Sequence, residues 1–566
     1  MTGTLLSVIL LLITCPLFAE NMTILVHPFK NTGEQKYSWI SPGMTDTVIS
    51  DLWKIRNITV ISETDRLKAI QELELSMTGL VDEEKARKTG KILGADIIFT
   101  GSYLVLGKRI RVNAHLVDVT KGSMERSVKI DGTIEKIFDL QDRIVLALVA
   151  ETEKIEIADI KRIHVSDNDK NKILSSTKPD LRAYERYSKG LEILHTNPRG
   201  ALRYFKEAIK IQSDYAEALA KAGLTAGYVL NLYDEGFGYL AKLDILYREK
   251  GETNTREYAV LMQLMGMMYH SRGETDRALD SYSRSMKILY GLGLEKSGHY
   301  AVIMANMANV YLDKKQPHKA LEYFTRSGNI LDSLGRQNTG AYAILLMSMG
   351  NIYYISQPDK SLEYFLKSSK IQDNLGLQNT SGYASLMTNM GNAYSIKKMP
   401  DRALMYYSRS KKIQETLRIG NTDNYAVLMS NMGIIFMLKK KPDTALEYFL
   451  KSKETKDRLK LQKTMGYASV MEYMGAALYA QGRYDTSLAY YLRSAKLYEI
   501  HHFQNTAQYA HILFRIAEAY EKREKRKQAG DYYRKAYNSY TEAGYTGELR
   551  GKALNNAERL QGKPAP

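Results

Sequence analysis

Small, apolar and polar positions alternate with a fixed period along the second half of the chain. Eight residues after a recurring Tyr-Ala pair stands Gly or Ala, and apolar residues surround it at the three- and four-residue spacing of one helical face. A second small residue, followed four positions later by an aromatic one, marks a second helix. The seven pairs lie 41 or 42 residues apart, at Tyr258, Tyr300, Tyr342, Tyr383, Tyr425, Tyr467 and Tyr509. This period predicts stacked helix pairs, because one pair alone cannot bury its apolar face.

The order of residues within each unit resembles the tetratricopeptide repeat of the longer, kinesin-light-chain-like kind. In residues 342–382, the small residues Gly350 and Ser361 are each followed by an aromatic residue at the expected spacing. An ordinary-length unit begins near Tyr187, and a degenerate one covers residues 215–257. The resemblance implies an all-α superhelical solenoid that binds proteins or extended peptide segments.

This interpretation predicts nine repeats over residues 181–545 and a C-terminal capping helix with its tail over residues 546–566. The capping helix is expected within residues 547–561, where an amphipathic run has one polar face. Solenoids need such a terminal element for solubility, because the last repeat has no neighbour to cover it.

A different pattern precedes the repeats. Short apolar runs at residues 23–26, 58–61 and 95–102 predict strands, and strict alternation over residues 110–116 predicts a half-buried strand that follows a turn near Gly107. Helical spacing is expected in three places, at residues 46–52, after Ser62 (Leu67, Ile70, Leu73 and Leu75), and at residues 82–93. We therefore expect an α/β domain, a mixed sheet with helices, over residues 20–160, and a linker over residues 161–180.

Five short segments of this α/β domain resemble the soluble domain shared by CsgG-type curli-secretion proteins and the TolB-N-terminal-like family. They are residues 26–31, 61–67, 90–96, 100–102 and 138–144. The resemblance implies a bacterial envelope component or a partner-binding domain, and it does not imply catalysis. Curli-secretion pores insert two amphipathic hairpins through the outer membrane, for which this chain has no spare pair of alternating segments. Pore formation is therefore not expected.

The first residues decide the predicted compartment. An apolar run from Leu5 to Ile13, with Ala19 ahead of Glu20, predicts a signal peptide over residues 1–19 and a protein exported to the periplasm or the outer membrane of a bacterium. Cys15, the one cysteine, offers the alternative of lipidation, although Thr14 is a poor residue before a modified Cys. No other stretch has the roughly 18 apolar residues of a membrane span.

Composition changes this picture little. Of the 566 residues, 44% are apolar and 25% charged, which is ordinary for a globular chain, and the formal net charge is +17. The basic excess lies in the repeats. It could favour acidic partners, or it could reflect a solvated helical surface, and no nucleic-acid partner is expected.

The candidate chemistry is sparse. The ten His residues never stand at metal-ligand spacing with a carboxylate, no glycine pattern matches a phosphate-binding loop, and the mature chain would hold no thiol nucleophile. The sequence therefore predicts no enzyme, cofactor or metal.

A column of polar residues on the first helices is the candidate partner site. It consists of Asn306, Asn309, Ser348, Asn351, Asn389, Asn392 and Asn431, which lie six or nine residues after their Tyr. Spacing of three places them on one helical face, where amides could hold the backbone of an extended peptide. The alternative is that each Asn merely bonds to a neighbouring helix.

We therefore predict a non-enzymatic, exported scaffold or adaptor that binds protein partners in the repeat groove and docks in the bacterial envelope through its α/β domain. One alternative is a component of an envelope secretion or assembly system, whose CsgG-like domain would oligomerise. Another is a binder of cell-wall polysaccharide. The sequence names no partner.

Overall fold

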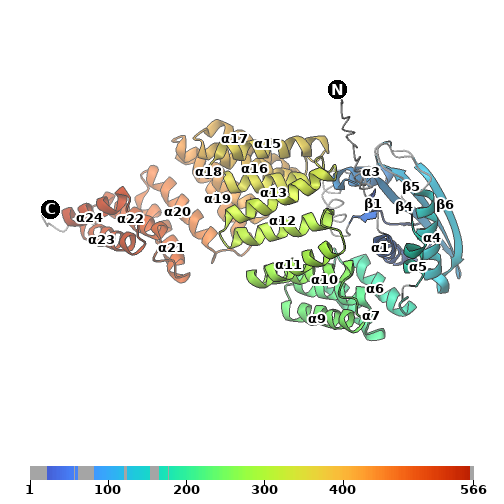
Figure 1. Cartoon of the computed structure of the whole chain (residues 1–566). Coiled ribbons are helices and arrows are strands. Elements are labelled where there is room, and N and C mark those ends of the chain that lie inside the picture. Colours follow the sequence, from blue (N-terminus) through green and yellow to red (C-terminus); the bar gives the residue numbers. More distant parts are fainter. Residues whose placement is uncertain are drawn as a thin grey trace, which may run out of the picture. The chain divides into compact units, whose positions relative to one another are not determined.

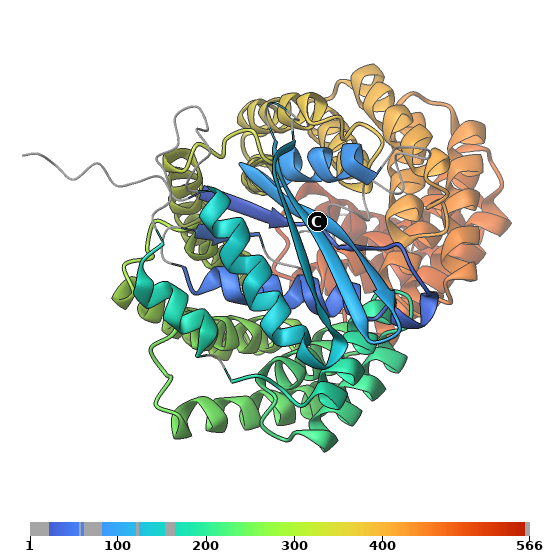
Figure 2. The same cartoon turned by 90° about the vertical axis from the view of Figure 1, so that its right-hand side faces the viewer.

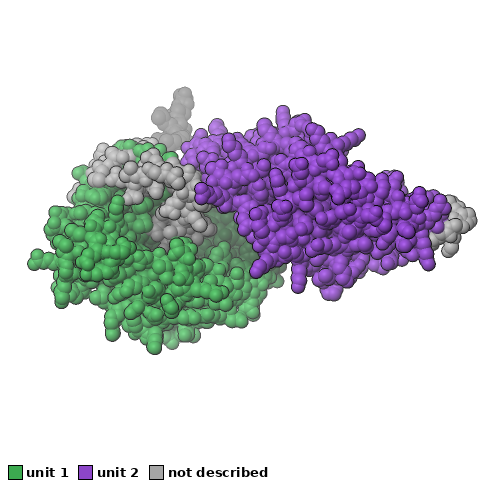
Figure 3. Space-filling model, turned by 180° about the vertical axis from the view of Figure 1, so that it is seen from behind, with its two compact units in different colours: residues 1–345 green, residues 346–566 purple. Residues whose placement is uncertain are grey.

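The computed structural model describes residues 22–55, 58–61, 82–119, 121, 124–152, 165–175 and 177–560. The chain divides into two compact units, residues 1–345 and residues 346–566 (Figure 3). The expected signal peptide with Cys15, and the helix expected after Ser62, lie outside the described residues.

The first unit opens with a mixed β-sheet in the strand order β3-β1-β4-β5-β6, with the short β2 paired to β4. Strand β1 runs parallel to both β3 and β4, whereas β4, β5 and β6 are antiparallel. The predicted turn at Gly107 joins β4 to β5. The strands are β1 (Met22–Val26), β2 (Lys30–Asn31), β3 (Ile58–Val60), β4 (Ile97–Leu106), β5 (Arg109–Asp118) and β6 (Met124–Thr133).

Helices cover both faces of this sheet (Figure 2). The alternation of a β-strand sends Ile24 and Val26 of β1 into the core beneath α1 (Ile40–Trp53) and α4 (Ile137–Thr152), while Leu25 points to the opposite face with Ile98 of β4. The helix α3 (Asp82–Leu93) spans the range that the sequence predicts. The helix α1 begins at Ile40, six residues before the predicted start, because Ile40 and Met44 are buried against the sheet.

Residues 161–180, expected as a linker, contain the short helix α5 (Asp167–Leu174). The side chain of Ser166 caps this helix by accepting a hydrogen bond from the backbone N–H of Asp169. Ile173 of α5 is buried in the core of the α/β domain.

Nine antiparallel helix pairs follow, and the last is covered by the predicted capping helix α24 (Glu548–Leu560) (Figure 1). This arrangement confirms the predicted fold class. Within the first unit the pairs are α6 (Leu181–Ile193) with α7 (Pro198–Ile211), α8 (Ala216–Leu224) with α9 (Tyr233–Glu249), α10 (Arg256–Ser271) with α11 (Thr275–Gly291), and α12 (Gly298–Asp313) with α13 (Pro317–Ser333). In the degenerate second pair, a π-helical turn over Thr225–Val229 extends α8.

The fifth pair contains the boundary between the units, at residue 345 in α14 (Gly340–Tyr353). The remaining helices of the second unit are α15 (Pro358–Asn374), α16 (Ser381–Ile396), α17 (Pro400–Thr416), α18 (Asp423–Leu438), α19 (Pro442–Arg458), α20 (Met465–Ala480), α21 (Tyr484–Ile500), α22 (Ala507–Lys522) and α23 (Arg526–Glu542).

Each recurring Tyr marks the start of a first helix, because a Ser or Thr three residues earlier is the N-cap. In α16, the Thr380 hydroxyl accepts the backbone N–H of Tyr383 at 3.2 Å. The equivalent caps occur from α10 to α22 in unit after unit, as at Thr255, Thr422 and Thr506.

The small-large spacing interlocks the two helices of a pair. A Cβ atom added to Gly391 of α16 would lie 2.4 Å from Cε1 of Tyr407 on α17, so only glycine lets the two helices approach this closely. Below this contact, the Ser410 hydroxyl donates a hydrogen bond to the carbonyl of Ala384 at 2.8 Å. The same glycine-to-aromatic contact recurs at Gly190, Gly266, Gly350, Gly433 and Gly475.

Candidate partner-binding face

First helices of successive repeats approach one another more closely than second helices do, as α16, α18 and α20 show. The first helices therefore form the inner side of the superhelix. On α16, the side chains that remain accessible to solvent lie on one helical stripe: Ser385, Thr388, Asn389, Asn392, Ser395 and Ile396. We call the corresponding open sides of α14 (from residue 346), α16, α18, α20 and α22 the inner face.

Four of the predicted asparagines meet in pairs across neighbouring first helices of the second unit. The Asn389 amide donates to the side-chain oxygen of Asn351 at 3.0 Å, and Asn431 donates to Asn392 at 3.0 Å. The Tyr407 hydroxyl donates to the same oxygen of Asn392 at 2.7 Å. The amides therefore bond to side chains of neighbouring helices. This is close to the alternative from the sequence, in which each Asn bonds to a neighbouring helix.

These bonds use only part of the amide capacity. An Asn side chain offers two N–H donors and an oxygen with two lone pairs. Among the described residues, Asn389 and Asn431 each donate one N–H, and the oxygen of Asn392 accepts two bonds. The second N–H of Asn389 and of Asn431 and the amino group of Asn392 have no hydrogen-bond partner among the described residues.

The other predicted site residues are placed less uniformly. Asn306 and Asn309 lie on α12 in the first unit, where Asn309 is exposed and Asn306 half-buried. Ser348 of α14 is half-buried at the start of the second unit.

The inner face carries almost no charge over its central part. The helix α16 contains no Asp, Glu, Lys or Arg, and α18 contains only Asp423, in its first turn. Exposed aliphatic side chains, such as Ile396 and Leu438 at the ends of these helices, stand beside the amides. The central part of the face, on α16 and α18, thus offers hydrogen-bonding amides and hydroxyls with apolar surface and almost no charge.

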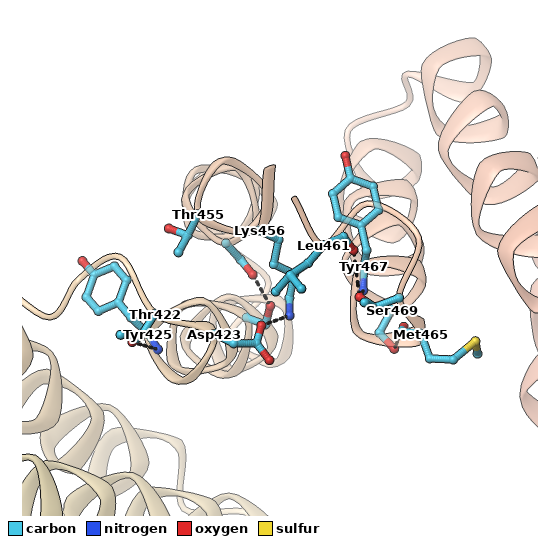
Figure 4. Close-up of polar contacts among 12 residues, drawn as sticks. Thr422, Asp423, Tyr425, Thr455, Lys456, Leu461, Met465, Tyr467 and Ser469 are labelled. Carbon is cyan, nitrogen blue, oxygen red and sulfur yellow. Dashed lines mark hydrogen bonds and ion pairs between the residues drawn. The ribbon is translucent and has the colours of Figure 1, made fainter. Parts of the chain in front are cut away.

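Asp423 itself is engaged by a buried lysine. The Lys456 side chain runs from α19 beneath the start of α20 and donates to the Asp423 carboxylate (Figure 4). Only 3% of the Lys456 side chain is exposed, against 54% of Asp423. This ion pair joins the two helices of the seventh repeat.

Charge reappears on the last two first helices. Glu472 of α20 occupies the position that Thr388 and Ser430 hold in the two preceding repeats. On α22, Arg515 forms an ion pair with Glu518 at 2.7 Å. Our sequence interpretation did not single out Glu472, although a carboxylate among equivalent Ser and Thr positions was the available signal.

In the first unit, the α/β domain covers the inner side of the first helices. Gly43 of α1 lies so close to α6 that an added Cβ would be 2.7 Å from the Tyr184 hydroxyl. Asp46 accepts a hydrogen bond from Tyr187 at 2.6 Å and lies 3.6 Å from the Lys221 ammonium of α8. Tyr184 belongs to the hydrophobic core of the α/β domain.

Further along, the contacts shift to the beginnings of the first helices. Arg256 of α10 donates to the Trp53 carbonyl at 2.9 Å, and the His299 ring of α12 stacks on the Trp53 indole. Arg336, ahead of α14, donates to the Thr23 hydroxyl of β1. The α/β domain is thus an internal partner of the first repeats, which the sequence did not predict.

Within the described ranges, no three His, Cys, Asp or Glu side chains lie close enough together to hold a metal ion. The same part of the chain has no helix whose length and hydropathy would let it cross a membrane.

These features define a solenoid of helix pairs with a tetratricopeptide-like fold. A family model described as "Tetratricopeptide repeat" matches residues 468–502, the helix pair α20 and α21. This match establishes the predicted repeat in the C-terminal region.

A search of curated proteins finds "Putative adenylate cyclase 3" of Rhizobium meliloti (strain 1021), which is 27% identical over 135 residues. That stretch is 24% of this chain and 21% of the relative, so the chain spans about a fifth of the relative's length.

Solved structures with similar folds include the quorum sensor NprR from B. thuringiensis, with 15% identity, a TM-score of 0.42, and coverage of 62% of this chain and 97% of that one. A Rap protein complexed with Competence and Sporulation Factor has 14% identity and a TM-score of 0.41, covering 66% and 99%. BtubC (BKLC) from P. vanneervenii has 18% identity and a TM-score of 0.33, covering 40% and 92%. At these identities the likeness concerns the fold alone.

Proposed function

We propose that the chain is a non-enzymatic scaffold that binds an extended segment of a partner protein on the inner face of its second unit. The observation that carries this proposal is the pairing of Asn389 with Asn351 and of Asn431 with Asn392. Each pair holds its amides in one orientation and leaves further donors for a ligand.

The spacing of these amides favours a backbone ligand. An extended chain presents N–H and C=O groups at regular intervals whatever its side chains, and amides that both donate and accept can bond to either group. Each bond contributes on the order of 0.5 to 1.5 kcal/mol. Because the amides are already ordered by their neighbours, binding costs little further side-chain entropy.

The partner segment is internal and is not held by a free C-terminal carboxylate. A site for a free carboxylate needs basic residues on the inner face. The positions two residues after the first six recurring Tyr residues are uncharged, namely Val260, Val302, Ile344, Ser385, Val427 and Ser469, and only the seventh is a histidine, His511.

The experiment is a titration of the full chain with a partner recovered by pull-down. The double variant Asn389→Ala and Asn431→Ala should weaken binding by about tenfold or more. The matched control is Asn379→Ala with Asn505→Ala, two exposed loop positions of the same unit, which should leave affinity unchanged. If the inner-face variant and the wild type bind with equal affinity, the asparagines of the inner face do not contact the partner.

Export and envelope docking belong to the same proposal. The apolar run from Leu5 to Ile13 with Ala19 supports cleavage of a signal peptide, and the CsgG/TolB-like segments support docking through the α/β domain. Mass spectrometry of the native protein distinguishes a chain that begins at Glu20 from one that carries a lipid on Cys15. An intact Met1 would contradict export.

The alternative of an oligomeric secretion component has one observation in its favour. Strand β6 is at an edge of the sheet, with no described strand on its outer side, and an edge strand can pair with a further strand. Light scattering of the full chain tests this, because a ring requires a large, uniform oligomer and an adaptor can be a monomer. For the polysaccharide alternative, sedimentation with cell-wall material is the corresponding measurement.

A further inference from the structure

Charge along the inner face changes abruptly at one residue. The helices α16 and α18 present amides, hydroxyls and aliphatic groups, and the first carboxylate on the open side of the next first helix is Glu472. This carboxylate lies one repeat beyond Asn431 along the same side of the superhelix.

Glu472 has no partner among the described residues. No described side chain donates a hydrogen bond to it or pairs with it at ion-pair distance. The cation that acts on it is Arg515 of α22, whose guanidinium is bonded to Glu518 at 2.7 Å. Burial raises the pKa of Tyr473, Tyr491 and Tyr498, and the charge of Glu472 adds to each of these shifts.

This arrangement is costly without a ligand. Glu472 is half-buried, and a carboxylate that loses water without gaining a partner loses solvation free energy. Burial accordingly raises the pKa of Glu472 to about 7, and Arg515 only partly opposes that rise. A cation bound beside it would restore the lost interaction.

We propose that Glu472 receives a Lys or Arg side chain of the extended partner segment, whose uncharged part lies along the paired asparagines. This inference rests on the proposed function and specifies the chemistry of its partner: an uncharged stretch with one basic residue. The formal charge of +17 would by itself attract acidic segments. A preference for a basic residue would therefore come from Glu472 and not from the net charge of the protein.

The test uses three pools of synthetic decapeptides that contain only uncharged residues except at one central position, which is Lys, Gln or Glu. Titrated against the full chain, the Lys pool should bind about tenfold more tightly than the Gln pool, and the Glu pool most weakly. Glu472→Gln should remove the difference between the Lys and Gln pools. Glu447→Gln, an exposed carboxylate of the second helix α19, is the matched control and should keep the Lys preference.

The pH dependence gives a second readout. The Lys preference should grow as pH rises through about 7, because Glu472 then loses its proton. The other groups near Glu472 do not change charge near pH 7. Burial raises the pKa of Tyr473, Tyr491 and Tyr498. The Arg515 guanidinium stays charged beside Glu518. Affinity of the Gln pool should stay flat with pH.

The outcomes separate the two proposals. Equal binding of the Lys and Gln pools, or a Lys preference that survives Glu472→Gln, overturns the role of Glu472. If the double variant Asn389→Ala and Asn431→Ala still weakens all pools, the peptide face itself stands. Absence of binding by every pool, or pools insensitive to the Asn variant, overturns both.

Discussion

The imidazole of His299 stacks on the indole of Trp53, with ring centroids 6.4 Å apart and ring planes at 29°. The two residues belong to α12 and α1, so this contact joins the fourth repeat to the α/β domain. The His299 Nε2 atom also lies 2.5 Å from the side-chain oxygen of Gln263 on α10. Burial, with a smaller contribution from the nearby positive charge of Arg256, lowers the pKa of His299 to about 4.

This lowered pKa predicts that the first unit loses stability in acid. The unfolded chain would bind a proton at His299 near pH 6.5, whereas the folded one would not until about pH 4. The free energy of unfolding is therefore unaffected by His299 above pH 6.5. It falls as pH drops toward 4, by on the order of 1 to 3 kcal/mol. Both tryptophans, Trp39 and Trp53, lie in the α/β domain, so tryptophan fluorescence during urea unfolding at several pH values measures this.

Two variants isolate the histidine. His299→Phe keeps an aromatic ring against Trp53 and removes the titration, so its urea midpoint should change less between pH 7 and about 5. His318→Phe replaces an exposed histidine of α13 and should keep the wild-type pH dependence. The same acid sensitivity in both variants would assign it to other groups.

The helix interlock predicts opposite effects for two glycines of the second unit. Gly391→Ala would push a methyl group against the buried Tyr407 ring, 2.4 Å from the nearest ring atom, and should destabilise by about 1 to 3 kcal/mol. Gly551, within α24, has no atom within 4 Å of an added Cβ. There, Gly551→Ala should stabilise by up to about 1 kcal/mol, because alanine favours a helix more than glycine does. Thermal unfolding followed by helical circular dichroism measures both, and a loss of equal size at the two positions would contradict the interlock.

Much of the solenoid could be predicted because its determinants are local. A Ser or Thr three residues before each recurring Tyr caps one helix, and a glycine such as Gly391 faces an aromatic residue only sixteen positions later, Tyr407. The geometry of each repeat is therefore determined within about 42 residues of sequence, and the seven pairs from α10 to α23 follow from this period.

Long-range contacts could not be predicted in the same way. The bond from Tyr187 to Asp46 joins residues 141 positions apart, and nothing in either local pattern pairs them. The packing of the α/β domain against the first repeats is therefore visible only in the structure. The asparagines were found by their spacing, but whether they would bond to backbone or to each other depends on how closely α16 and α18 approach.

Backbone geometry after the second helices predicts a stabilising substitution. Gly376 follows α15 with φ of 71°, in the left-handed region, and Arg418 holds the equivalent position after α17 with φ of 56°. A residue with a Cβ atom is strained there, so Arg418→Gly should stabilise the second unit by about 0.5 to 1 kcal/mol. The reverse change, Gly376→Ala, should destabilise it by a similar amount. Chemical unfolding of both variants decides this, and stabilisation by Gly376→Ala would refute it.

The buried pair of Lys456 and Asp423 predicts an asymmetry between its two partners. Asp423→Asn leaves the Lys456 ammonium, only 3% exposed, without its carboxylate. Because Asp423 itself is half-exposed and water can replace part of the lost interaction, we expect a loss of about 1 to 3 kcal/mol, below that of a fully buried pair. Lys456→Met keeps most of the side-chain volume and removes the charge that needs a partner, so it should be nearly neutral or stabilising.

Asp401→Asn is the control for the asymmetry between Asp423 and Lys456. Asp401 also stands in the first turn of a helix, α17, and pairs with Lys439, but this pair is largely solvated, with 84% of the Asp401 side chain exposed. Both Asp variants lose the same favourable charge near a helix N-terminus, so the difference between them reports burial of the lysine. Asp401→Asn should cost less than about 1 kcal/mol. In the background of Lys456→Met, the cost of Asp423→Asn should fall to that of Asp401→Asn, and a cost that stays unchanged would show that Asp423 stabilises α18 without Lys456.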